Sequence, residues 1–193
     1  MTFRLADSLP QAFWASFRDA QELWLKQNEI DPNAVDWKQS FLALTAEKKQ
    51  EFEKVTGLKL NQNLDQGYGS CLLKEPGISN IVDKSLTFFH GSRIWTGDRV
   101  VMPNHVHALL TPIGDEKLEE VLQSIKGFTA NAINKLRSIE GPVWSRESYD
   151  HIVRDEEQLA RVQRYIRNNP AKAGLTEGNY LLNAEETTYQ IIR

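Results

Sequence analysis

The 193-residue chain has a single cysteine, no long apolar run and no excess of basic residues. Its mean hydropathy is -0.48. Its apolar runs, such as 100–102 and 108–110, are far shorter than the ~20 residues that span a bilayer. No basic segment followed by an apolar run stands at its start, and Cys71 has no cysteine to pair with. We therefore expect no export signal, no membrane partner and a cytoplasmic location.

Charge is unevenly distributed along the chain. A formal net charge of -3 argues against coating nucleic acid by bulk electrostatics. Acidic residues concentrate before residue 66 and after residue 182, whereas basic residues surround Tyr165. These candidate DNA-binding residues are Arg154, Arg161, Arg164, Arg167 and Lys172. They form either a local phosphate-binding surface or an ordinary solvated helix face.

The length fits one domain over 1–193, with a mostly helical N-terminal part over 1–91. Polar residues and Pro10 before an apolar stripe predict a first helix, and Gly91 ends the last one. The elements expected here are a strand over 2–5, a helix to about Gln27, a helix over 37–55, a turn over 64–69 and a helix over 78–89.

The pattern changes to strands and amphipathic helices in a core over 92–176. The expected elements are strands 94–102 and 105–111 joined at Pro103-Asn104, a helix over 118–136, a strand over 143–153, and a helix over 156–168 closed by Asn169-Pro170. Antiparallel strands backed by helices make an α+β fold. The tail, 177–193, shows no clear pattern.

Two histidines stand on the second of these strands. Because alternate side chains of a strand share a face, His105 and His107 should point the same way as Leu109. Two imidazoles so placed can hold one divalent metal ion. The alternative is a pair of half-buried histidines bonded to their neighbours.

Tyr165 and Asn169 are four residues apart on the last predicted helix, so they share one face. A free phenol has a pKa of about 10 and attacks phosphate poorly without assistance, whereas a carboxamide oxygen is a reasonable hard metal ligand. Alternatively, Tyr165 is an ordinary core aromatic beside the apolar stripe that includes Val162 and Ile166.

Two sequence motifs, in this order along the chain, resemble those of a known family. Residues 102–110 read MPNHVHALL, and residues 165–175 read YIRNNPAKAGL. Together they resemble the single-tyrosine HUH transposases, of the IS200-like and REP-associated tyrosine transposase type. The resemblance covers roughly residues 92–176, with weaker similarity over 2–10 and 64–71. Ser145 stands where this family has glutamine.

The resemblance implies a ferredoxin-like (RRM-like) palm and a set of site residues. His105, His107 and Asn169 would bind Mg²⁺ or Mn²⁺, and Tyr165 would be the nucleophile. The substrate would be single-stranded or hairpin DNA, cut and rejoined through a 5′-phosphotyrosine, and the protein would be nucleoid-associated. One turn before Tyr165 stands Arg161, so we expect one catalytic tyrosine.

Several alternatives stay open at this stage. The histidines could activate water in a metal-dependent hydrolase, or the chain could be a non-catalytic module that binds hairpin DNA. Relatives of this type include homodimers with shared active sites and single-subunit enzymes. Trp95 and Trp144 could stack on unpaired bases or belong to the core, and we leave His151 out of the metal set.

Overall fold

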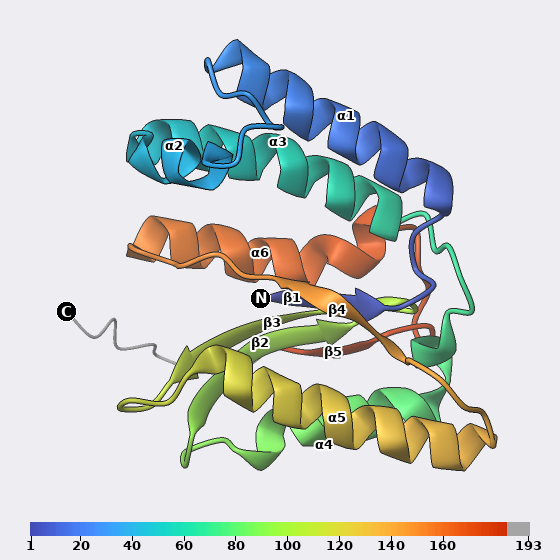
Figure 1. The fold of residues 1–193 in the computed structure, drawn as a ribbon. Coiled ribbons are helices and arrows are strands. Elements are labelled where there is room, and N and C mark those ends of the chain that lie inside the picture. The colour runs from blue at the N-terminus through green and yellow to red at the C-terminus, as the bar shows by residue number, and fades with distance from the viewer. Residues whose placement is uncertain (185–193) are drawn as a thin grey trace. The chain divides into compact units, whose positions relative to one another are not determined.

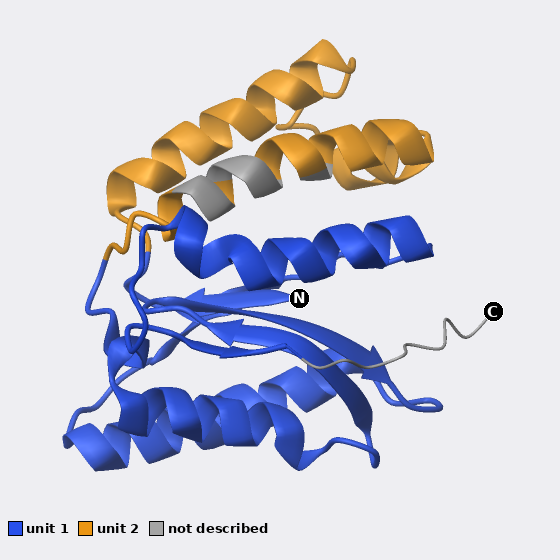
Figure 2. Ribbon diagram, turned by 180° about the vertical axis from the view of Figure 1, so that it is seen from behind, with its two compact units in different colours: residues 1–8, 69–193 blue, residues 9–68 orange. Residues whose placement is uncertain are grey.

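The computed structural model describes residues 1–184, without the side chains of residues 53, 57–59, 61 and 62. The chain forms two compact units, one made of residues 1–8 with 69–193 and the other of residues 9–68 (Figure 2). The single domain over 1–193 stays a prediction, and 185–193 of the predicted tail lie outside the described residues. Within the described part, no helix is long and apolar enough to cross a membrane.

The larger unit contains an antiparallel sheet in the order β4-β1-β3-β2-β5 (Figure 1). Its strands over the described residues are β1 (Thr2–Leu5), β2 (Ile94–Val101), β3 (His105–Pro112), β4 (Trp144–Tyr149) and β5 (Leu181–Asn183). The first four strands have the ferredoxin-like order, since this unit contributes one α-helix to the connection from β1 to β2 and another to the connection from β3 to β4.

Helices pack on both faces of this sheet (Figure 1). In this unit they are the 3₁₀ turn η1 (Leu72–Lys74), α4 (Pro76–Phe88), α5 (Leu118–Arg137) and α6 (Glu156–Lys172). The main core lies between the sheet and α4 and α5, where Phe3 and Val106 are buried. A second cluster beneath α6 contains Leu109 and Ile166. The α+β fold class, a ferredoxin-like palm backed by helices, is confirmed.

The smaller unit is helical, with α1 (Gln11–Gln27), α2 (Trp37–Ala43) and α3 (Ala46–Leu64). The rings of Trp24, Phe41 and Phe52 pack edge to face in its core. The prediction of one helix over 37–55 was wrong, because the helix is interrupted at Leu44, which has an extended backbone. Thr45 Oγ1 then caps α3 by accepting a 3.3 Å hydrogen bond from the Lys48 backbone amide.

The end of α6 also differs from the prediction. Asn169-Pro170 does not close this helix, which continues to Lys172 with Pro170 inside it. A proline in the last turn removes only one intrahelical donor. The following amides of Ala173 and Leu175 donate to Asn169 O and Pro170 O, both at 2.9 Å. The helix therefore keeps Asn169 within its regular part.

Two strands differ as well. β4 ends at Tyr149, so residues 150–153 are not part of the predicted strand 143–153. In the tail, where no element was expected, β5 pairs with β2. Asn183 fixes it by donating to Asp83 Oδ1 of α4 at 2.9 Å, and Arg99 of β2 donates to the same oxygen at 2.6 Å. This polar anchor adds to the packing of Leu181 and Leu182 against the two apolar clusters.

Candidate active site

The two histidines share one face of β3, as their spacing predicted. Leu109 lies on this face in the cluster beneath α6, whereas Val106 and Ala108 lie in the core on the opposite side. His105 is 0% and His107 is 3% exposed. A pair of imidazoles is therefore buried between the sheet and α6, where polar groups need partners.

Each histidine has a partner for its Nδ1 atom. His105 Nδ1 lies 2.8 Å from Asn104 Oδ1, and His107 Nδ1 lies 2.7 Å from Thr2 Oγ1. The register of β1 against β3 pairs Thr2 with His107 and so places the hydroxyl there. The two Nε2 atoms face each other at 3.0 Å. Both rings are thus held with Nε2 directed to one point.

Burial keeps this pair neutral. It lowers the pKa of His105 to about 3, and it lowers the pKa of His107 well below the usual value, with His105 as a further cause. A neutral imidazole has a lone pair on one nitrogen, which is the form that binds a metal. The pair is available as ligands at physiological pH.

The tyrosine approaches from α6. Asp155 caps this helix by accepting the Gln158 amide at 2.7 Å, and an apolar stripe that includes Ile166 packs on the sheet. This packing fixes the helix rotation and brings the Tyr165 hydroxyl to 3.4 Å from His107 Nε2. Tyr165 is half-buried. It also packs against the cluster beneath α6. Tyr165 therefore lies beside the histidine pair and also contacts the apolar stripe that the core-aromatic alternative named.

Asn169, one turn after Tyr165, is fully buried. Among the described residues, neither its Oδ1 nor its Nδ2 has a hydrogen-bond partner. A buried polar group without a partner costs about 1–3 kcal/mol, so such groups are rare unless they serve a ligand. In the described part no cluster of three His, Cys, Asp or Glu residues could hold a metal ion. Two neutral imidazoles and an unsatisfied carboxamide oxygen nevertheless fit a divalent ion with open positions.

The predicted DNA-binding residues occupy different environments. Lys172 Nζ lies 5.9 Å from the centroid of the Tyr165 ring. Arg167 Nε instead donates to the fully buried Asp98 at 2.7 Å, which ties α6 to β2. Arg161 pairs with Glu157 of its own helix at 3.6 Å. Arg154 and Arg164 are exposed, and Arg164 also donates to a carbonyl of its own helix. Lys172 is therefore the candidate that lies beside Tyr165.

The remaining candidates, two tryptophans and a histidine, differ in burial. Trp144 is 7% exposed, and its Nε1 donates to Thr129 at 2.8 Å, so it belongs to the core. Trp95 is 48% exposed, and its strand partner Thr111 lies on the histidine face of β3. His151 is exposed and follows the end of β4. Sequence reasoning missed Thr2 and Asn104 as partners of the histidines.

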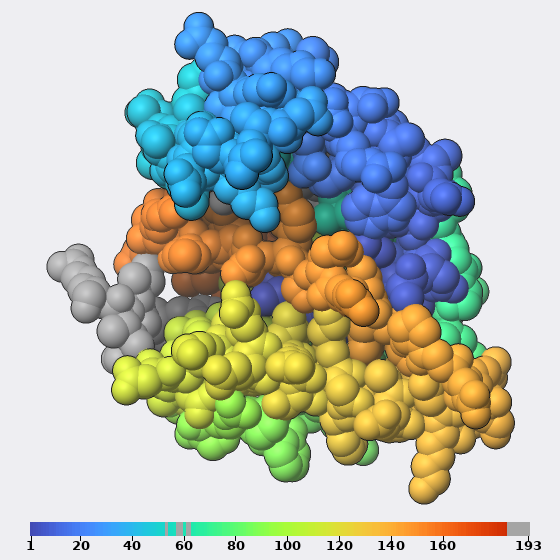
Figure 3. Space-filling view, viewed as in Figure 1, coloured from blue at the N-terminus to red at the C-terminus, as the bar shows by residue number. Residues whose placement is uncertain are grey.

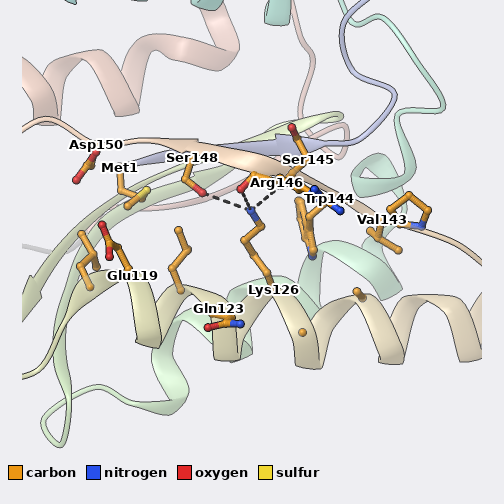
Figure 4. A pocket seen from close by; sticks show the side chains of 15 residues that line it. Met1, Glu119, Gln123, Lys126, Val143, Trp144, Ser145, Arg146, Ser148 and Asp150 are labelled. Atoms are coloured by element: carbon orange, nitrogen blue, oxygen red, sulfur yellow. Dashed lines mark hydrogen bonds between the residues drawn. The ribbon is translucent and has the colours of Figure 1, made fainter. Parts of the chain in front are cut away.

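A cleft of about 640 Å³ lies between α5 and the edge strand β4 (Figure 4). Lys126 of α5 crosses it and donates to Ser145 O and Arg146 O at 2.6 and 3.2 Å. In Figure 3 the start of the chain is visible in a hollow between α5 and α6. The cleft opens on the α5 side of the sheet, whereas the histidines lie on the α6 side. It is not part of the His–Tyr site.

The span from β2 to Asn169 has known relatives. Residues 94–169 match the model of the family described as "Transposase IS200 like". This segment contains both histidines, the tyrosine and the asparagine. Residues 94–169 belong to the IS200-like transposase family. Three of the four strands of the ferredoxin-like palm lie within this IS200-like segment.

Two curated proteins of Haemophilus influenzae are similar to part of this chain. An uncharacterized protein is 26% identical, over 37% of this chain and 51% of the relative. A protein named "Putative REP-associated tyrosine transposase" is 29% identical, over 40% of this chain and 49% of the relative. The chain thus matches about half the length of each relative. No solved structure matches it.

Proposed function

We propose that this chain is a transposase that cleaves and rejoins single-stranded DNA through a 5′-phosphotyrosine, with a divalent metal ion. The transposase role itself rests on the family of residues 94–169. The chemistry rests on one observation: the Tyr165 hydroxyl lies 3.4 Å from His107 Nε2, and that atom lies 3.0 Å from His105 Nε2. A nucleophile and a metal-binding pair therefore meet at one point.

Tyr165 is the attacking group in this proposal. Its oxygen forms a bond to the scissile phosphorus, the bond from phosphorus to the 3′ oxygen breaks, and the phenol proton ends on the 3′-OH. One phosphate ester replaces another, so a free 3′-OH can reverse the step without ATP. The half-buried position of Tyr165 leaves its ring accessible to a strand, and Lys172 beside it can contact a phosphate.

His105, His107 and Asn169 would hold the metal ion. When bound, Mg²⁺ or Mn²⁺ would supply Lewis-acid polarisation of the scissile phosphate. The protein residues contribute neutral nitrogen ligands and a buried amide oxygen. Three protein ligands leave positions for water and for substrate.

The proposed substrate is a single strand, with or without an adjoining hairpin, bound at a local basic surface around Lys172. A cytoplasmic, nucleoid-associated location follows from that substrate. A homodimer stays a prediction. Recognition would combine backbone contacts with contacts to unpaired bases.

The test uses labelled single-stranded and hairpin oligonucleotides with Mg²⁺, Mn²⁺ or EDTA, separated on denaturing gels. We expect a protein–DNA adduct that needs metal and disappears in Tyr165→Phe. Cleavage that persists in Tyr165→Phe without any adduct would instead identify a water-activating hydrolase. Metal-independent hairpin binding without cleavage would identify a non-catalytic binding module. Trp144→Phe, a change in the core, is the matched aromatic control.

A further inference from the structure

An ion pair joins α6 to strand β2 close to the candidate site. Arg167 Nε donates to Asp98 Oδ2 at 2.7 Å, and Arg167 Nη2 donates to Asp98 Oδ1 at 3.4 Å. Asp98 is fully buried, whereas the Arg167 side chain is 42% exposed. Two hydrogen bonds between a guanidinium and a carboxylate fix direction as well as distance. The pair therefore sets the orientation of α6 as well as its separation from the sheet.

Asp98 faces α6 because β2 contains an extra residue. Thr96 faces the other side, where its hydroxyl donates to Leu86 O of α4 at 2.8 Å. In a regular strand residues two apart share a face, so Asp98 would also point toward α4. Instead the register shifts, since Thr96 and Arg99 are three residues apart and pair with residues 110 and 108 of β3. This bulge redirects Asp98 toward α6, and bulges often redirect a side chain beside a functional site.

Arg167 lies midway between two residues of the candidate site. Tyr165 precedes it by two positions, and Asn169 follows it by two. The apolar cluster beneath α6, which includes Ile166, selects the face of the helix that meets the sheet. Apolar contacts are non-directional, so they still permit small rotations and shifts of the helix. A slip of one residue would turn these side chains by about 100° and move them by about 1.5 Å.

Stability alone does not explain a buried ion pair at this place. Apolar residues of similar volume often stabilise a protein as well or better, because both charges of a pair must leave water. A second pair lies on the opposite face of β2, where Arg99 donates to Asp83 of α4 at 2.6 Å. β2 is thus tied to one helix on each face of the sheet (Figure 1). Of the two pairs, Asp98–Arg167 is the one that holds the helix carrying Tyr165.

We propose that Asp98 is a positioning residue for the cleavage reaction. Through Arg167 it holds α6 in the setting that keeps the Tyr165 ring beside His107, with ring centroids 5.1 Å apart. The same setting keeps Asn169 fully buried. This role rests on the proposed function, because the setting of α6 matters for chemistry when Tyr165 attacks DNA. Asp98 acts through Arg167 and the helix rather than on the substrate.

The test removes the charges of each ion pair in turn. The variant Asp98→Asn, Arg167→Met breaks the pair on α6 without leaving a buried charge unpaired, so its free energy of unfolding should stay close to the wild-type value. The variant Asp83→Asn, Arg99→Met is the matched control on the opposite face of β2. Arg167→Lys keeps the charge but loses the planar fork, and it decides the question if the first variant does not fold.

The first measurement is the nuclear Overhauser effect between the ring protons of Tyr165 and His107, in Mg²⁺ and without DNA. We expect this contact in the wild type and in the control variant. It should weaken or disappear in the variant without the Asp98–Arg167 pair, since α6 can then shift. An unchanged contact in that variant overturns the proposal. This readout does not depend on whether the protein cuts DNA.

The second measurement is the single-turnover rate of adduct formation with Mn²⁺ and saturating single-stranded DNA. A misplacement of about 1 Å can cost about 100-fold in rate, so we expect a loss of about 10–100-fold without the Asp98–Arg167 pair and a smaller loss in Arg167→Lys. The control variant should react at the wild-type rate, and the dissociation constant for DNA should be the same in all variants.

Two outcomes of the rate measurement overturn the positioning role. The first is a wild-type rate in both variants at Arg167. The second is weaker DNA binding with a wild-type rate at saturation, which would identify Arg167 as a phosphate contact. Wild-type protein that forms no adduct under any condition contradicts the proposed function instead, and the ring contact then still decides whether Asp98 positions Tyr165.

Discussion

Tyr165 and Asn169 lie one turn apart on the same face of α6, yet only Tyr165 reaches solvent. Tyr165 is half-buried with its hydroxyl 3.4 Å from His107 Nε2, whereas Asn169 is fully buried and has two polar atoms without partners among the described residues. A fold does not gain stability from such an amide. This difference in exposure supports the proposed roles, in which Tyr165 attacks the substrate and Asn169 binds the metal ion.

The first prediction concerns this asparagine. Asn169→Leu should raise the free energy of unfolding in EDTA by about 1 kcal/mol, because it removes buried polar atoms that lack hydrogen bonds. The same change should abolish the rise in Tm that Mn²⁺ gives the wild type by binding the native state. Thermal unfolding with and without Mn²⁺ measures both effects. A less stable variant that keeps its Mn²⁺ response would contradict a ligand role.

The second prediction separates anchoring from DNA binding at Arg167. Its guanidinium donates to Asp98, which is fully buried, while the Arg167 side chain itself is 42% exposed. Arg167→Met should lower the free energy of unfolding by about 2 kcal/mol, since it removes a cation from a buried carboxylate. Adding Asp98→Asn should restore most of this loss. Urea denaturation of the single and double variants tests the coupling, and a fully stable single variant with weak DNA binding would favour a phosphate contact instead.

The third prediction concerns Lys172, whose Nζ lies over the Tyr165 ring. In a Tyr165→Phe background, Lys172→Ala should weaken single-strand binding and reduce the salt-dependence slope by about 0.7, as expected for the loss of one phosphate contact. Arg161→Ala is the control, because Arg161 pairs with Glu157 in its own helix. Fluorescence anisotropy at several salt concentrations gives both slopes. Equal slopes for the two variants would remove Lys172 from the DNA surface.

The fourth prediction assigns Trp144 to the core. Its indole donates to Thr129 at 2.8 Å and packs edge to face on Phe3, with centroids 4.9 Å apart. Trp144→Phe should lower the free energy of unfolding by about 1–3 kcal/mol, because it loses that hydrogen bond and part of the buried ring. Oligonucleotide binding by the folded protein should not change. A selective loss of DNA binding would revive base stacking at this position.

The sequence was most informative where a residue pattern has a single period. Alternation along β3 correctly placed His105 and His107 on one face, and a long helical stripe predicted α5. The pattern failed where a local contact decides the structure. Thr45 caps α3 within an otherwise continuous helical pattern, and a hydrogen bond to Asp83 helps to hold β5, which has only three residues.

The candidate site was only partly predictable for a related reason. The spacing of Tyr165 and Asn169 predicts a shared helix face, but it does not predict burial or the missing partners of the amide. Thr2 could not be connected to His107 from spacing, because 105 residues separate them and the strand register alone brings them together. Contacts between distant strands depend on the whole sheet.

The position of β1 in the chain has a consequence for when the site can form. Residues 9–68 separate β1 from the rest of its unit, and its neighbours in the sheet are β3 and β4. Long-range strand pairing is slow, because a large loop must close before any contact stabilises it. During synthesis the first strand must therefore wait until β3 and then β4 have left the ribosome. A nascent fragment that ends before Tyr165 lacks both α6 residues of the candidate site, so the site can be completed only late in synthesis.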